Sequence, residues 1–167
     1  MRFIHFSLVL CCVLFCLSGC SFKPANPEGR LDVSGTITLN GGPFEKAHMA
    51  SIIFEPIDDP SSGSSTTSFS VLTGKFLCTM QNGLKPGKYR VRILAYAQYD
   101  KRTKQPIDLN APPETNVDEI DGKSYYVALL PPEFNDNSAI EFEVVKSRKN
   151  VFDYNIETSF VPDTTPP

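Results

Sequence analysis

Apolar and polar positions alternate in short segments through most of the chain, and this period of two is typical of half-buried β-strands. The clearest case is residues 88–97, where Val91, Ile93 and Ala95 point to one side and charged residues to the other. The pattern predicts seven strands, over residues 31–39, 50–55, 74–78, 88–97, 124–130, 138–145 and 150–157. Because no segment has the period of an amphipathic helix, the sequence predicts an all-β fold, an antiparallel seven-stranded β-sandwich.

Turn residues separate the predicted strands. Asn40-Gly41 predicts a hairpin that returns directly to the strand at 50–55, because both residues tolerate positive φ. Pro86-Gly87 predicts a type II bend before the strand at 88–97. The polar stretch 58–68 and the long segment 99–123 are interpreted as loops.

The N-terminus has the layout of an export signal, with Arg2 followed by the ten apolar residues 8–17, too few to span a bilayer. Leu17-Ser18-Gly19-Cys20 then resembles the bacterial lipobox. That resemblance implies cleavage before Cys20, a diacylglycerol on its thiol and acylation of the new amine, which together anchor a protein firmly. An ordinary signal peptide or a buried N-terminal helix are the alternatives.

These features divide the chain into four parts. Residues 1–19 are the predicted signal peptide, 20–30 the lipidated cysteine and a flexible spacer, 31–158 the sandwich, and 159–167 a proline-rich tail expected to fray. Cleavage would remove Cys11, Cys12 and Cys16. With Cys20 lipidated, Cys78 is the one candidate free thiol, so no disulfide is expected.

Composition fits this interpretation. The 167 residues are 41% hydrophobic and 21% charged, as in an ordinary globular protein of one domain. The 16 Lys and Arg against 19 Asp and Glu give a net charge of −3, which argues against nucleic acid as a partner.

Four segments resemble a known family. VSGTITLNGGPFEKAHMASIIFEP, TGKF, GLKPGKYRVRI and LLPPEFNDNSAIEFEVVKSRKNVFDYNIE look like a carboxypeptidase regulatory-like, transthyretin-like domain. The last segment is similar to small lipid-anchored members of that class in planctomycete-type bacteria. The resemblance covers residues 31–158 and implies a Greek-key sandwich at the cell envelope, with no particular activity.

Candidate catalytic residues are few. Without residues 1–19 the chain has one histidine, His48, which we expect to face solvent at the start of a strand. Cys78 shares a strand face with Phe76 and is predicted to be a small buried hydrophobe. The transthyretin-like fold also includes a purine-pathway hydrolase that uses several histidines and a Tyr-Arg-Gly-Ser terminus, neither of which this chain has. We therefore predict no catalytic residues and no enzyme.

Acidic residues of the long loop are the candidates for a cation. Asp118, Glu119 and Asp121 lie close together, near Glu114 and Asn116, and their oxygens suit calcium. Ile120 stands where a calcium loop needs an oxygen ligand, so a solvated acidic loop is the preferred interpretation and no cofactor is predicted.

Tyrosines and basic residues are the remaining candidates for binding, with no ligand assigned to them. Tyr96, Tyr99, Tyr125 and Tyr126 could stack on sugars or a partner protein, although half of them are expected to complete the core. A possible basic patch comprises Arg90, Arg92, Lys101, Arg102 and Lys104, interpreted instead as a strand face and a loop.

The sequence thus predicts an exported protein, lipid-anchored to the outer membrane or the periplasmic side of the inner membrane. Its sandwich is expected to bind or scaffold an envelope protein or polysaccharide. A carbohydrate-binding module and a calcium-dependent adhesion domain are the alternatives.

Overall fold

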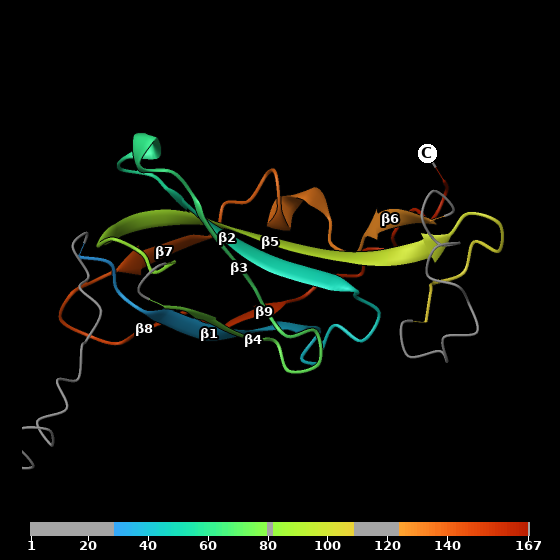
Figure 1. Cartoon of the computed structure of the whole chain (residues 1–167), viewed down its shortest axis with the longest axis horizontal. Coiled ribbons are helices and arrows are strands. Elements are labelled where there is room, and N and C mark those ends of the chain that lie inside the picture. The colour runs from blue at the N-terminus through green and yellow to red at the C-terminus, as the bar shows by residue number, and fades with distance from the viewer. Residues whose placement is uncertain (1–28, 80–81, 109–123, 167) are drawn as a thin grey trace, which may run out of the picture.

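Two facing β-sheets with a hydrophobic interior make up the computed structural model, which describes residues 29–79, 82–108 and 124–166 (Figure 1). The strands are β1 Val33–Leu39, β2 Met49–Pro56, β3 Ser65–Ser68, β4 Lys75–Cys78, β5 Gly87–Asp100, β6 Ser124–Ala128, β7 Glu141–Val144, β8 Asn150–Val151 and β9 Tyr154–Ile156. Two short 3-10 helices, η1 Pro60–Ser62 and η3 Pro132–Phe134, lie in connections. The predicted all-β class is confirmed.

The sheets differ in their central strand. In the five-stranded sheet the order is β3-β2-β5-β6, and β7 also pairs with β5. In the four-stranded sheet the order is β4-β1-β8, and β9 also pairs with β1. β5 is therefore the central strand of the five-stranded sheet, and β1 is the central strand of the four-stranded sheet.

The predicted strand at 150–157 differs from the structure in two ways. It is divided into β8 and β9, and both run parallel to β1, so the prediction of seven strands, all antiparallel, is wrong. The break lies at Phe152 and Asp153, where the Thr36 N–H donates to the Asp153 carboxylate rather than to a main-chain carbonyl. A local side chain thus replaces one hydrogen bond of the strand ladder.

The turn at Asn40-Gly41 forms as expected, with φ values of 51° and 78°, but it does not make the predicted hairpin. The chain instead crosses to the other sheet, because both edges of β1 are occupied, by β4 on one side and by β8 and β9 on the other. The polar stretch 58–68 is also more ordered than a loop. It contains η1 and the edge strand β3, in which Thr66 pairs with Ile53 of β2.

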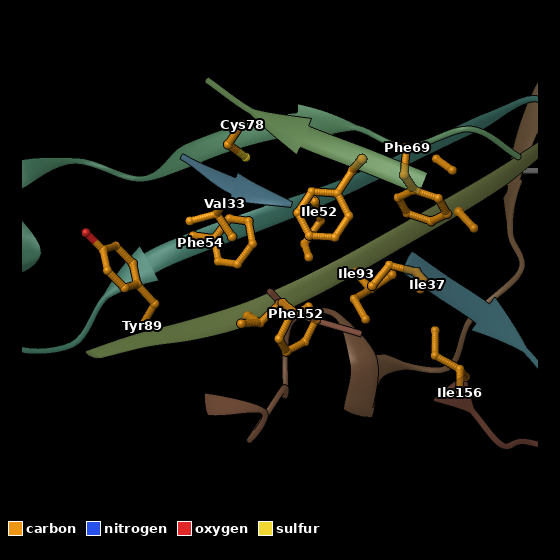
Figure 2. Close-up of a cluster of buried hydrophobic side chains, with 14 of the residues drawn as sticks. Val33, Ile37, Ile52, Phe54, Phe69, Cys78, Tyr89, Ile93, Phe152 and Ile156 are labelled. Atoms are coloured by element: carbon orange, nitrogen blue, oxygen red, sulfur yellow. The ribbon is translucent and has the colours of Figure 1, made fainter. Parts of the chain in front are cut away.

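The inward positions of the alternating pattern form the core between the sheets. Figure 2 shows Val33 of β1 near Phe54 of β2, and Ile37 of β1 near Ile93 of β5. Phe54 is at its centre, with ring centroids 6.1–6.4 Å from four other aromatic rings. The largest fully buried side chains are Phe44, Phe54, Ile37, Ile52, Leu84, Ile93, Ile156, Val33, Val91, Val144 and Cys78.

β5 extends further than its pattern predicts, to Asp100 rather than residue 97. Its 14 residues span about 45 Å at the usual rise per residue. It begins beside the point where the chain enters the sandwich, since Leu31 pairs with Leu84 through both main-chain hydrogen bonds. We call the other end, formed by the buried residues Ala97, Tyr99, Tyr125 and Val127, the distal cluster.

The C-terminal tail lies against this distal cluster. The Tyr125 hydroxyl donates to the Thr164 carbonyl at 2.5 Å, and Asn40 and Thr158 exchange two hydrogen bonds where the tail begins. The tail therefore joins the two sheets rather than fraying as expected.

Candidate functional site

Two groups of predicted site residues lie outside the described part of the chain. These are the lipobox residues Leu17, Ser18, Gly19 and Cys20, and the loop acids Asp118, Glu119 and Asp121. Lipidation and cation binding at these positions stay predictions.

His48 is half-buried, so the expectation that it faces solvent is wrong. Its Nδ1 accepts a hydrogen bond from the Gln98 N–H at 3.0 Å, and its Nε2 contacts the Ile107 carbonyl. The imidazole therefore holds residue 107 beside the end of β5, where β2 no longer pairs with it. Because both of its ring nitrogens contact the main chain, His48 has a structural role.

Cys78 is buried in the core as predicted, with 1% of its surface exposed. Burial disfavours the thiolate and raises the pKa of Cys78 to about 11. A nucleophilic cysteine needs a low pKa, so this thiol is a packing group.

The four candidate tyrosines divide as expected. Tyr99 and Tyr125 are buried together, with ring centroids 5.8 Å apart, and complete the distal cluster. Tyr96 is half-buried and Tyr126 is 55% exposed. The structure therefore does not bring the four rings together as one stacking platform.

Arg90 and Arg92 project from the outer face of β5 and meet a carboxylate that the sequence did not single out. Arg90 donates through Nε and Nη2 to one oxygen of Glu55, at 2.8 and 2.5 Å, and Arg92 donates to the other at 2.8 Å. The pKa of Glu55 is lowered, chiefly by the hydrogen bond from Arg92. Arg92 also contacts Asn135 and Asp136. Arg90 and Arg92 are thus both paired with acids in this ion-pair network.

A cleft of 630 Å³ lies beside this network on the outer face of the five-stranded sheet. In Figure 1, the green coil of η1 and the orange connection that carries η3 rise from that same side of the sheet. Pro56, Ile57 and Pro60 line the cleft, together with Ser138 and Ala139. Its volume is in the range of small-ligand sites, so it is the candidate binding site of this molecule.

Two charged side chains that line the cleft have hydrogen-bonding capacity to spare. Arg90 is 50% exposed, and its Nη1 has no hydrogen-bond partner in the part of the chain that the structure describes. Glu141, on β7, is the register partner of Arg90, is exposed, and forms no ion pair with the described residues. A cation and an anion thus line the same cleft.

The sequence contains a partial signal for this cleft. Basic residues alternate outward at positions 88, 90 and 92, and acidic residues do so at 141 and 143, as expected for two exposed strand faces. Which acid faces which base depends on strand register, and the contact of Glu55 with both arginines depends on β2 lying on the other side of β5.

Within residues 29–79, 82–108 and 124–166, no group of three or more His, Cys, Asp or Glu side chains could hold a metal ion. No helix in these ranges is long and apolar enough to cross a membrane.

Comparisons with known proteins identify no family. No protein-family model matches the chain, and neither does any curated protein. Among solved structures, the chain is similar to a candidate adhesin from Bacteroides ovatus, with 16% identity and a TM-score of 0.39. The match covers 84% of this chain, which spans about half (49%) of that structure.

Proposed function

We propose that this protein is a lipid-anchored, non-enzymatic binding module of the cell envelope. Cys20 would carry the lipid, on the outer membrane or on the periplasmic side of the inner membrane, and the sandwich would bind a protein or polysaccharide. The observation that carries the proposal is the order Leu17-Ser18-Gly19-Cys20 at the end of the ten-residue apolar run 8–17.

The start of the sandwich supports this proposal. Arg30 donates to the Gly83 carbonyl at 2.9 Å, and Leu31, near the start of the described residues, forms a β-bridge with Leu84. Arg30 is ten positions after Cys20, and an extended segment of that length spans at most about 35 Å. A lipid on Cys20 would therefore keep the sandwich near the membrane surface.

We further propose that the sandwich is of the carboxypeptidase regulatory-like, transthyretin-like type. Two of the segments that carry the resemblance fall on structurally important positions. TGKF leads into β4, and GLKPGKYRVRI includes buried Leu84 and the start of β5. These positions support the proposal through packing and not through a ligand site.

The anchor is tested by Cys20→Ala in the full chain. We expect the variant to lose palmitate labelling and to remain uncut before residue 20, because the modified thiol is the substrate of both steps. The measurements are metabolic labelling and the mass of the N-terminal peptide.

Cys16→Ala is the matched control, since it removes a cysteine four residues upstream within the apolar run. It should be labelled and processed like the parent chain. A Cys20→Ala variant that is still labelled and shortened would refute the lipoprotein assignment.

A further inference from the structure

The outer-face cleft combines one cation, one anion and an apolar wall. Glu55 does not contribute a free charge, because it accepts hydrogen bonds from both Arg90 and Arg92. The unused Nη1 of Arg90 and the carboxylate of Glu141 are what the cleft offers to a charged ligand. Arg90 is also fixed in position, since its Nε and Nη2 are both held by Glu55.

Arg90 and Glu141 are directly opposite one another on β5 and β7, yet they form no ion pair within 4.0 Å. Directly opposite Cβ atoms on neighbouring strands are about 5 Å apart, and two long side chains can diverge from there. An extended dipeptide, whose two ends are separated by about 7 Å, is long enough to reach two such side chains at once.

The walls of the cleft suit apolar side chains. Pro56, Pro60 and Ile57 line it, and 42% of the Ile57 surface is exposed. A ligand with apolar side chains would remove part of this surface from water, which favours binding.

We propose that this cleft binds short zwitterionic peptides with apolar side chains. The terminal carboxylate pairs with Arg90, the terminal ammonium pairs with Glu141, and the side chains contact the Pro56 and Ile57 wall. The inference rests on the proposed function of the sandwich as a binding module and names its ligand class.

The test uses the full chain in a non-ionic detergent and the dipeptide alanyl-leucine, with binding followed by NMR titration. Because the cleft is open and its charges are hydrated, we expect a Kd on the order of 1 mM. Amidating the carboxylate of the dipeptide, or acetylating its amine, should each weaken binding about two- to fivefold.

Variants assign each charge to its partner. In Arg90→Gln, amidation of the dipeptide should no longer weaken binding, whereas acetylation still should. In Glu141→Gln, the reverse should hold. Lys88→Gln and Glu143→Gln are matched controls, because Lys88 and Glu143 are the exposed register partners two residues further along the same strands and do not line this cleft.

Three results would overturn the proposal: no binding by the parent chain, equal weakening by the control variants, or sensitivity to amidation that persists in Arg90→Gln. Should Arg90→Gln fail to fold, the amidated and acetylated dipeptides test the same two contacts on the parent chain. If the parent chain is labelled with palmitate but does not bind the dipeptide, only the proposed cleft site is refuted. If the parent chain binds the dipeptide but is not labelled, only the proposed anchor is refuted.

Discussion

At the scale of the residue, Glu55 is the acid most constrained by its neighbours. Each of its oxygens accepts a hydrogen bond from a different arginine of β5, and 23% of its side chain is exposed. These contacts favour the carboxylate over the protonated acid, so the pKa of Glu55 lies below its ordinary value of 4.5, with Arg92 as the largest cause.

The stability of the protein should therefore depend on the protonation of Glu55. A lowered pKa in the folded state means that the unfolded chain takes up this proton at a higher pH, so the stabilisation is present above pH 4.5 and is lost as the pH falls further. We expect Glu55→Gln to lower the free energy of unfolding by about 1 kcal/mol at pH 7 and to have less effect at pH 3. Urea unfolding at both pH values measures this difference.

Glu143→Gln is the control for this experiment, because Glu143 is an exposed acid of β7. It should change the free energy of unfolding little at either pH. An effect of Glu55→Gln that is equally large at pH 3 and pH 7 would contradict the assigned role.

The sequence could predict the environment of a single residue where strand alternation alone determines it, and not where it depends on residues far along the chain. The period of two was enough to place Cys78 inside and Arg90 outside. It could not predict that His48 would bind the Gln98 N–H and contact the Ile107 carbonyl, because these groups lie 50 and 59 positions away. The same holds for Glu55, whose partners are 35 and 37 positions away.

At the scale of the element, the main chain of β1 lies very close to the main chain between β8 and β9. A Cβ atom on Gly35 would lie 1.8 Å from the Phe152 carbonyl oxygen and 2.9 Å from the Phe76 ring. Only a residue without a side chain at position 35 allows β1 to approach Phe152 this closely.

Gly35→Ala should therefore push β1 away from Phe152 and destabilise the protein by about 3 kcal/mol, measured by urea unfolding. Gly42→Ala is the matched control, because a Cβ atom there has its nearest neighbour at 3.8 Å. It should stay within about 0.5 kcal/mol of the parent. Equal stabilities of the two variants would show that the close approach at Gly35 is not required.

The strands could be predicted where apolar and polar residues alternate strictly, as over residues 88–97. The strands with which they pair could not be predicted. Asn40 and Gly41 adopt the positive φ values that their residue types favour. That preference determines the turn alone, whereas the sheet that receives the following strand depends on which edges of β1 are already paired.

At the scale of the whole molecule, the C-terminal tail connects the two layers at the end remote from the entry of the chain. Its first contact is with Asn40, which follows β1, and its last is with Tyr125 of β6. Between these contacts, Phe160 and Pro162 line a cavity of 280 Å³ together with Phe44 and Leu129.

Tyr125→Phe should loosen this connection, because it removes the hydrogen bond to the Thr164 carbonyl while the ring stays in the distal cluster. We expect limited proteolysis to cleave residues 160–166 several times faster, with the sandwich itself intact. Tyr126→Phe is the control, since Tyr126 is 55% exposed, and it should be cleaved like the parent. Equal cleavage of the two variants would contradict a role for Tyr125 in holding the tail.

The parallel pairing of β1 with β8 and β9 sets the order in which the protein can be completed. Ile37 of the first strand and Tyr154 of the last are neighbours, 117 positions apart in the chain. During synthesis β1 therefore emerges long before the strands that cover one of its edges, and the four-stranded sheet stays incomplete until β9 has been made. Closing so large a loop is slow. Until residue 156 has been synthesised, that edge of β1 therefore has no partner strand, and the side of the core that Phe152 and Ile156 fill stays open.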